Sequence, residues 1–403
     1  MTIDPEELRQ RRQQRKKKKN KKTVIRLAVL GAVLLLVILL IVAAGGKKKS
    51  ADVETVDEAD LTVIRLAAAG DLNVTQSVVD SGGEEFDYTK TLMDVLPLLG
   101  DADISVVNFE GNLNDAPYGD SRSAPQSLIK ALERAGVDLV QIANSYAIYQ
   151  GMDGLARTIQ GIRMAGMEPV GAYETRKEAQ ARKGYTIQVV EDVKIAFVAF
   201  TKGMDGMALP AGNEGCVNVL YKDYATDYQV VDTSGINQVL SNVRKEKPDL
   251  TVALVHWGSE FKDDVSTSQE KIRKLLLDGG VDVILGTHPH FLQQMEYDAK
   301  KGTFVAWSLG DFMGDARRAG SEYSVVLELE ITKNNKTGKT RVTGYSYTPI
   351  FTVNEEGRPL QVVRIQEAMR AYEQGYIEKV SQATYEAMEY ALERIEARIH
   401  GKK

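Results

Sequence analysis

Three of the four histidines in this 403-residue chain fall in two short runs in its second half. His256 follows the apolar run 250–255, and His288 and His290 follow the apolar run 281–285. Imidazole is the commonest nitrogen ligand for zinc, iron, copper or nickel. One histidine beside an apolar run is more often a packed or surface residue. Two such runs, each at the tip of a predicted strand, indicate a metal site.

Two acidic residues end apolar runs in the first half of the chain. Asp71 lies in Ala69-Gly70-Asp71-Leu72-Asn73, and Glu110 lies in Val107-Asn108-Phe109-Glu110-Gly111. The adjacent glycines permit tight turns and a close approach of the backbone to a ligand. Taken singly, each acid is better explained as a turn or capping residue. With the three histidines they form a mixed oxygen and nitrogen set for one or two divalent metals, which polarise phosphoryl oxygens and activate water.

The elements that must position these residues alternate along the chain from residue 62 onward. Apolar runs predict strands over 62–69, 104–109, 138–143, 193–200, 249–255, 281–285 and 303–309. Helical periodicity appears over 126–135, 154–165, 236–246 and 268–278. This alternation predicts an α/β layered domain, whose ligands collect at the carboxyl ends of the strands. The polar residues described above lie at those ends.

The last third of the chain has a different pattern. Residues 322–353 alternate with a period of two around the turn 334–338, which predicts a closing β-hairpin. Residues 360–399 read as helical, with an apolar stripe of Ile377, Val380, Thr384, Met388, Leu392, Ile395 and Ile399. We expect this stripe to pack against the domain. The alternative is that it binds a partner subunit of a membrane synthase complex.

The first 44 residues have the composition of a membrane anchor. Residues 1–26 contain eleven Lys or Arg and three acidic residues, and the eighteen residues 27–44 carry no charge. At about 1.5 Å per residue this run nearly spans the roughly 30 Å hydrocarbon core, and the basic flank places the N-terminus in the cytoplasm. We predict an uncleaved single-pass anchor in the cell membrane, with the main domain extracellular. A cleaved signal peptide ending near 43–46 is the alternative, although the apolar run is longer than usual.

The charge of the chain limits its possible binding partners, and its cysteine content limits its possible disulfides. Residues 45–61 form a polar linker, and the basic cytoplasmic tail suits anionic lipid headgroups. Residues 27–403 contain 40 basic and 53 acidic residues, a net charge of −13. This acidic region is not expected to bind nucleic acid. The single cysteine, Cys216, excludes an intramolecular disulfide.

The order of the motifs from about residue 63 to 312 resembles the CapA family of poly-γ-glutamate capsule-synthesis proteins, a branch of the calcineurin-like metallophosphoesterase fold. The motifs are Gly70-Asp71, Asn108-Phe109-Glu110-Gly111, Arg122-Ser123-Ala124-Pro125, Gly171-Ala172-Tyr173, His256-Trp257-Gly258-Ser259-Glu260, Gly286-Thr287-His288-Pro289-His290 and Ser308-Leu309-Gly310-Asp311-Phe312. The resemblance implies a four-layer αββα sandwich of two mixed sheets over residues 62–358, followed by a helical segment, 359–403. It also implies an extracytoplasmic role in the synthesis or attachment of a capsule or envelope polymer.

One motif departs from this family. Its members typically carry Ala-Asn-Asn-His where this chain has Ala143-Asn144-Ser145-Tyr146. In the phosphoesterase fold the second Asn resembles a metal-ligating amide, and the His resembles the group that assists the reacting oxygen. Ser145 reaches less far than an amide, and a phenol with a pKa near 10 does not exchange protons at neutrality. Loss of a general acid or base removes about 10²- to 10⁴-fold of rate, so we expect weak or no hydrolysis.

The remaining candidates define a degenerate metal site. The resemblance implies a divalent metal held by Asp71, His256, His288 and His290, with Glu110 as a further ligand or supporting residue; the metal identity stays open. The candidate substrate-binding residues are Asn108, Arg122, Asn144, Tyr146 and Glu260. With Arg122, the basic residues Lys262, Arg317 and Arg318 are candidates for pairing with an anionic polymer such as polyglutamate. The alternative function is an active metal-dependent hydrolase or phosphoesterase.

Overall fold

The computed structural model describes residues 60–316, 318–376 and 380–401. The predicted basic tail 1–26, the anchor 27–44 and nearly all of the linker 45–61 lie outside these residues. Within the described ranges, no helix combines the length and the hydropathy needed to cross a bilayer. The elements described below belong to the unit that begins at Thr62, except that its first strand starts one residue earlier.

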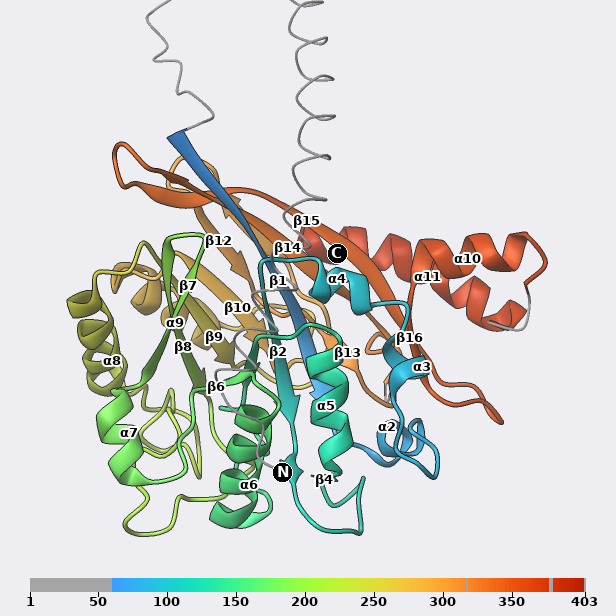
Figure 1. Ribbon diagram of the computed structural model, residues 1–403, viewed down its shortest axis with the longest axis horizontal. Coiled ribbons are helices and arrows are strands. Elements are labelled where there is room, and N and C mark those ends of the chain that lie inside the picture. The colour runs from blue at the N-terminus through green and yellow to red at the C-terminus, as the bar shows by residue number, and fades with distance from the viewer. Residues whose placement is uncertain (1–59, 317, 377–379, 402–403) are drawn as a thin grey trace, which may run out of the picture. The chain divides into compact units, whose positions relative to one another are not determined.

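The first sheet is mixed and has eight strands in the order β16-β15-β14-β1-β2-β5-β6, with β13 also pairing with β1 (Figure 1). Strands β1, β2, β5, β6 and β13 are parallel, whereas β14, β15 and β16 pair antiparallel. The strands are β1 (Leu61–Asn73), β2 (Ile104–Glu110), β5 (Leu139–Gln141), β6 (Glu168–Val170), β13 (Asp311–Met313), β14 (Tyr323–Asn334), β15 (Thr340–Val353) and β16 (Gln361–Arg364).

The second sheet is also mixed and has six strands in the order β11-β12-β10-β9-β8-β7. Its four central strands are parallel, and the two edge strands pair antiparallel. The strands are β7 (Tyr185–Val190), β8 (Val193–Thr201), β9 (Leu250–His256), β10 (Val283–Thr287), β11 (Met295–Asp298) and β12 (Thr303–Ala306). A separate two-stranded sheet pairs β3 (Asn112–Leu113) with β4 (Ser123–Ala124).

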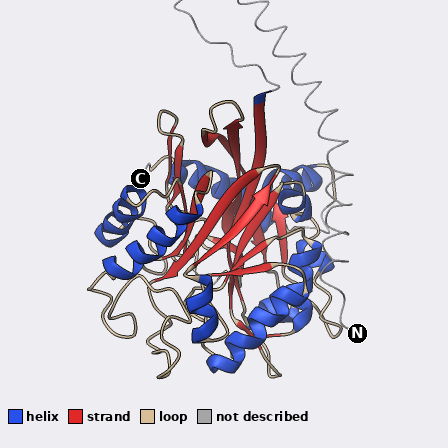
Figure 2. Ribbon diagram, turned by 60° about the vertical axis from the view of Figure 1, so that its left-hand side comes forward, coloured by secondary structure: helices blue, strands red, loops and turns tan. Residues whose placement is uncertain are grey.

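The helices lie outside the strands (Figure 2). They are α2 (Gln76–Asp80), α3 (Thr89–Leu92), α4 (Leu96–Gly100), α5 (Gln126–Arg134), α6 (Gly151–Met164), α7 (Arg176–Arg182), α8 (Thr233–Glu246), α9 (Thr267–Asp278), α10 (Ile365–Glu373) and α11 (Gln382–Ile399). The local sequence determines where some of these helices begin. Helix α9, for example, begins with a capping box in which the Ser266 and Gln269 side chains satisfy each other's backbone N–H groups.

Side chains that alternate along β8 separate the two hydrophobic cores. Ile195, Phe197 and Ala199 join the larger core, which also contains the buried residues of the first sheet. Ala196, Val198 and Phe200 join a smaller core with apolar residues of α8 and α9. Because successive strand residues point to opposite faces, the second sheet is covered by α8 and α9 on one face and by the larger core on the other.

These elements confirm the predicted α/β class and the two mixed sheets. The hairpin predicted over 322–353 is also confirmed, since β14 and β15 pair antiparallel on either side of residues 335–339. The helical prediction from residue 360 is wrong at its start, because Gln361–Arg364 forms β16. Two adjacent β-branched valines there pair with β15, and this tertiary pairing determines the local conformation.

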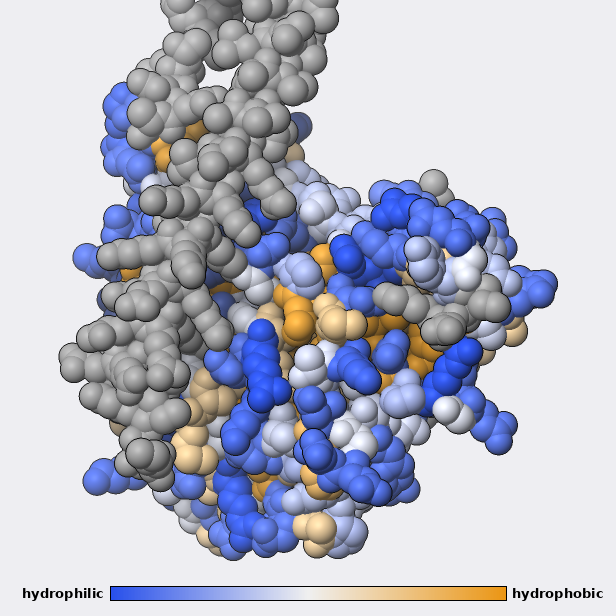
Figure 3. All heavy atoms as spheres, turned by 45° about the vertical axis from the view of Figure 1, so that its right-hand side comes forward, coloured by the Kyte–Doolittle hydropathy of each residue, from blue (hydrophilic) through white to orange (hydrophobic). Residues whose placement is uncertain are grey.

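The C-terminal stripe packs against the domain, as predicted. Val380, Met388, Ile395 and Ile399 belong to the same core as the first sheet, and Thr384 and Leu392 are partly buried. Ile377 lies outside the described residues. Figure 3 shows a mostly hydrophilic outer surface over the α10–α11 pair, with a smaller hydrophobic area beside it. The apolar side of α11 is therefore used within the domain.

Candidate metal centre

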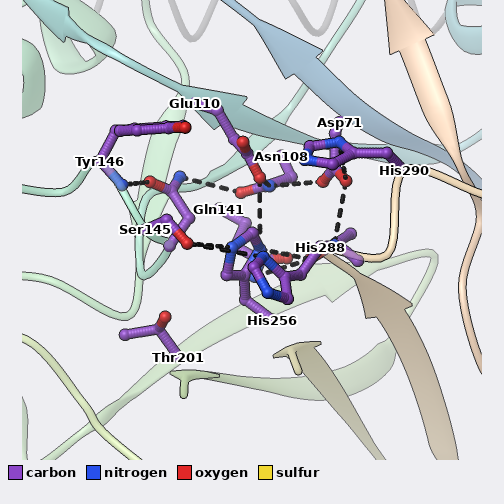
Figure 4. Close-up of polar contacts among 12 residues, drawn as sticks. Asp71, Asn108, Glu110, Gln141, Ser145, Tyr146, Thr201, His256, His288 and His290 are labelled. Carbon is purple, nitrogen blue, oxygen red and sulfur yellow. Dashed lines mark hydrogen bonds and ion pairs between the residues drawn. The ribbon is translucent and has the colours of Figure 1, made fainter. Parts of the chain in front are cut away.

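The candidate ligands lie at the carboxyl ends of parallel strands in both sheets (Figure 4). In the first sheet, the register pairs Asp71 with Asn108 and Asn73 with Glu110. In the second sheet, it pairs Thr287 with His256, and the histidine loop follows directly. Strand pairing therefore brings together residues that lie far apart in the sequence.

A close backbone approach adds Asp311 to this group. Strand β13 pairs with β1 so that Asp71 is opposite Asp311, and the Asp71 N–H donates to the Gly310 carbonyl over 3.0 Å. A Cβ on Gly70 would lie 1.8 Å from that same oxygen. Only glycine allows this contact, which sets the two carboxylates side by side.

Asp71, Glu110 and His256 form the first group, with ligand atoms that lie within 4.8 Å of one another. Glu110 Oε1 lies 3.4 Å from His256 Nδ1. The amide of Asn108 donates to Asp71 Oδ1 over 2.7 Å and to Glu110 Oε1 over 3.1 Å. Asn108 therefore orients both carboxylates of this group.

Asp71, His290 and Asp311 form the second group under the same distance limit. His290 Nδ1 lies 2.8 Å from Asp311 Oδ1 and 3.6 Å from Asp71 Oδ2. The Asn73 amide donates to Asp311 Oδ1 over 2.9 Å and lies 3.4 Å from His290 Nδ1. The two groups share Asp71, so the arrangement is one connected cluster.

His288 belongs to neither group but lies in direct contact with the cluster. Its backbone N–H donates to Asp71 Oδ2 over 2.9 Å, and its ring centroid lies 4.6 Å from that of His256. His288 and His290 have positive φ angles of 92° and 58°. Non-glycine residues rarely adopt such angles, and the strain they cause is concentrated at functional sites. The loop conformation is therefore held by its surroundings.

Burial and mutual charge shift the pKa values of Asp71, Glu110 and the three histidines. Burial raises the pKa of Asp71 to about 6, and burial together with the Asp71 charge raises the pKa of Glu110 well above its usual value. Burial lowers the pKa values of His256 and His288 well below 6.5. Burial also disfavours the charged form of His290, but the nearby carboxylates, Asp311 first, outweigh it and raise the pKa to about 10. Two imidazoles are thus neutral and one is charged at pH 7.

The residues present fit a divalent metal. Glu110 Oε2 and Asn73 Oδ1 are buried and have no hydrogen-bond partner among the described residues, and a cation would satisfy both oxygens. Carboxylates and neutral imidazoles are ligands that zinc, manganese and iron accept. The buried Asp, Glu and His groups could therefore hold a metal. A metal held there would supply Lewis-acid chemistry toward a bound oxygen.

Of the pair Ser145 and Tyr146, only Ser145 contacts the imidazoles of the cluster. Ser145 Oγ lies 3.0 Å from His256 Nε2 and 3.5 Å from His288 Nδ1. The Tyr146 hydroxyl accepts a hydrogen bond from Arg122 Nη2 over 3.1 Å, and the guanidinium lies 4.2 Å from the ring centroid. Ser145 thus contacts the candidate ligands, and Tyr146 is paired with a cation.

The other predicted substrate-binding residues lie partly inside the protein and partly on its surface near the cluster. Asn144 is buried, and its amide binds Phe109 O, Asn108 Oδ1 and the Tyr146 N–H, so it supports the site from within the protein. Glu260 is exposed, with Oε1 at 3.9 Å from His290 Nε2. The basic candidate Arg318 lies 4.9 Å from the Phe261 ring, whose centroid is 5.3 Å from that of His290. The carbonyl of Lys262 accepts a hydrogen bond from Gln293, and Arg317 lies outside the described residues.

Asp311, Asn73 and Thr287 are site residues that the sequence reasoning did not assign. Gly310-Asp311 repeats the pattern of Gly70-Asp71 after an apolar run, and this repeat was the available signal for Asp311. Asn73 lies two residues after Asp71 and therefore on the same face of β1. Thr287, whose Oγ1 lies 3.1 Å from His256 Nδ1, had no distinguishing signal.

Residues 65–316 match the family model described as bacterial capsule synthesis protein PGA_cap. The chain belongs to this family. It is 27% identical over 294 residues to the capsule biosynthesis protein CapA of Bacillus anthracis, covering 70% of this chain and 65% of that protein. It is 26% identical over 237 residues to the PGA biosynthesis protein CapA of Bacillus subtilis (strain 168), covering 59% of this chain and 58% of that protein. The matches thus span less than two thirds of these relatives.

Among solved structures, a phosphatase from Mycoplasma pneumoniae aligns over 72% of this chain and 94% of its own length, with a TM-score of 0.42 and 14% identity. A hypothetical protein from Thermus thermophilus aligns over 71% of this chain and 98% of its own length, with a TM-score of 0.40 and 15% identity.

Proposed function

We propose that this CapA-family chain is a single-pass membrane protein whose extracellular domain acts in the synthesis or attachment of a capsule or envelope polymer of the poly-γ-glutamate type. Family membership supports the capsule role, and the uncharged run 27–44 after a basic tail supports the anchor. The partners in this proposal are the membrane, the anionic polymer and subunits of a membrane synthase complex. We also infer a four-layer αββα arrangement, since helices cover the outer face of the second sheet and contact the first.

In this proposal the domain holds a divalent metal, binds and guides the polymer at that site, and hydrolyses the polymer weakly or not at all. The observation that carries this proposal is the position of Ser145 and Tyr146 at the buried cluster of candidate ligands. Ser145 Oγ lies 3.0 Å from a His256 nitrogen and 3.5 Å from a His288 nitrogen. Serine has no amide oxygen, so this position lacks the metal-ligating group that the family asparagine resembles. The Tyr146 hydroxyl is oriented by Arg122 and replaces the family histidine, which leaves this position without a group that exchanges protons near neutrality.

Metal content and turnover of the purified full-length protein test this proposal. We expect bound divalent metal and little hydrolysis of phosphoester or γ-glutamyl substrates. Rapid turnover that disappears in a His290→Ala variant would show that the chain is an efficient enzyme and would contradict the proposal. Absence of metal, together with unchanged polymer production in cells that carry His288→Ala, would show that the cluster has no function.

A second candidate function is metal-dependent hydrolysis or transfer. The observation that favours it is the sharing of Asp71 between two ligand groups, because carboxylates between two metals are used to activate water. The same turnover measurement separates the two candidates, since only the enzyme predicts multiple turnovers that depend on added metal.

A further inference from the structure

Lys202 lies at the edge of the candidate metal centre, at the end of β8. Its backbone N–H donates to the His256 carbonyl over 2.8 Å, and the preceding residue, Thr201, pairs with His256 in the strand register. Figure 4 shows Thr201 on the same side of the cluster as Ser145 and His256. The backbone of Lys202 therefore lies next to His256, at the imidazole half of the site.

The ammonium group of Lys202 forms no ion pair among the residues that the structure describes, and the exposed Glu260 acts on it only at longer range. Its Nζ donates to the Gly258 carbonyl over 2.9 Å and lies 4.8 Å from the centroid of the Tyr228 ring. The side chain is partly buried, and its charge contributes to the lowered pKa values of His256 and His288. An ammonium has three donors, so two remain available to a ligand.

Arg122 is a second cation, on the other half of the site. Its guanidinium donates to the Val74 carbonyl over 3.0 Å and to the Tyr146 hydroxyl over 3.1 Å, and no carboxylate within the described ranges forms an ion pair with it. Its backbone carbonyl accepts a hydrogen bond from the N–H of Asn112, two residues after Glu110, over 2.8 Å, which places Arg122 toward the carboxylate half. Arg122 also has a φ of 59°, an angle that its surroundings must maintain.

We propose that Lys202 and Arg122 form two anion-binding positions on either side of the metal centre and hold separate acidic groups of one polyanionic ligand. This inference rests on the proposed function and assigns the ligand class as a chain that carries repeated carboxylates. A partly buried cation without a counter-ion is unfavourable, and a carboxylate of the ligand would form charge-assisted hydrogen bonds with it. Residues 27–403 have a net charge of −13, so two cations without a counter-ion at one site give a local positive potential that favours the binding of an anionic chain there.

Binding of γ-linked glutamate oligomers to the full-length protein tests the inference. We compare a pentamer with free glutamate in the wild type and in the Lys202→Met and Arg122→Met variants. Each variant should bind the pentamer about tenfold or more weakly and with a smaller salt dependence, as expected for the loss of a charge-assisted contact. The matched control is Lys301→Met, which removes an exposed lysine that pairs with Asp298 at 3.7 Å and should leave binding unchanged.

The metal affinity and melting temperature of the Lys202→Met variant show whether weaker pentamer binding comes from the lost ammonium group or from damage to the metal site. Lys202→Met removes a positive charge beside the ligands, so it should bind metal as tightly as the wild type or more tightly, with an unchanged melting temperature. If Lys202→Met lowers metal affinity, the Lys202→Arg variant decides: restored pentamer binding supports the inference, and continued loss overturns it.

The outcomes separate this inference from the proposed function. If the wild type binds the pentamer and Lys202→Met binds it equally well, the role of Lys202 is overturned while the proposed function stands. If the wild type does not bind the pentamer, the proposed polymer is wrong, and inorganic phosphate becomes the probe. Weaker phosphate binding in Lys202→Met would then support an anion position, whereas equal or absent binding would overturn it.

Discussion

Metal uptake should release a proton from His290 at neutral pH. The pKa of His290 is about 10 because the carboxylates around it outweigh the effect of burial, so the free imidazole carries its proton at pH 7. A metal ligand must be neutral imidazole, and removing a proton three pH units below its pKa costs about 4 kcal/mol. We therefore expect metal affinity to rise about tenfold per pH unit from pH 7 to 9. The rise should be steeper below pH 6, where the Asp71 carboxyl, with a pKa of about 6, also binds a proton.

Isothermal titration of the metal-free protein measures this release directly. Titrations in two buffers with different ionisation enthalpies give the number of protons released per metal, and competition with a chelator at several pH values gives the slope. We expect at least one proton per metal at pH 7. The matched control is His400→Gln, because His400 lies after α11 with its side chain 43% exposed and should not affect proton release.

Metal binding with no proton release at pH 7, or an affinity that does not change between pH 7 and 9, would refute this reasoning. Either result would mean that His290 is already neutral in the free protein or that it does not bind the metal. The metal affinity of a His290→Asn variant separates the two explanations. The variant should bind metal more weakly than the wild type if His290 is a ligand, and equally well if it is not.

Four further results are expected. Asp311→Asn should weaken metal binding by tenfold or more, as measured by chelator competition, whereas Ser145→Ala should change it little. Gly70→Ala should lower the unfolding free energy by about 1–3 kcal/mol or prevent folding, because its Cβ would lie 1.8 Å from a carbonyl oxygen; an unchanged denaturation midpoint would contradict the close approach. The double change Ser145→Asn with Tyr146→His should raise phosphoester turnover about 10²- to 10⁴-fold, and metal-loaded protein without this gain would argue against the role given to the pair. Arg398→Met should cost about 1–3 kcal/mol in urea denaturation, because its buried guanidinium donates to a backbone carbonyl and lies over two aromatic rings.

The strand pattern was readable because it depends on local composition. The runs that end at Asp71, Glu110 and His256 are nearly continuous in apolar residues, as expected for parallel strands buried on both faces. Parallel strands align their carboxyl ends. The sequence therefore predicts that ligands at these ends lie close together, even when the pairing partner of each strand is not known. The same logic made the histidine loop after β10 a sound candidate.

The rest of the site depended on pairing between segments that are distant in the sequence. Asp311 joins Asp71 through the parallel contact between β13 and β1, and that contact requires a position without a Cβ at Gly70. No local pattern specifies which strand will approach which glycine. β16 was missed for a related reason, since a four-residue strand at a sheet edge has too few residues to show a period and is stabilised by its neighbour β15.

The substituted pair does not affect both halves of the cluster equally. Ser145 contacts His256 and His288, so the shorter side chain alters only the half that contains the first ligand group. The second group, Asp71, His290 and Asp311, has no contact with Ser145 among the described interactions, and the Asn73 amide supports it from the same strand as Asp71. Under the proposed function, Ser145 would remove a ligand from one half and leave the other half intact, which would impair two-metal chemistry more than metal binding itself. Metal affinity and turnover would then differ in one site, so the two properties must be measured separately.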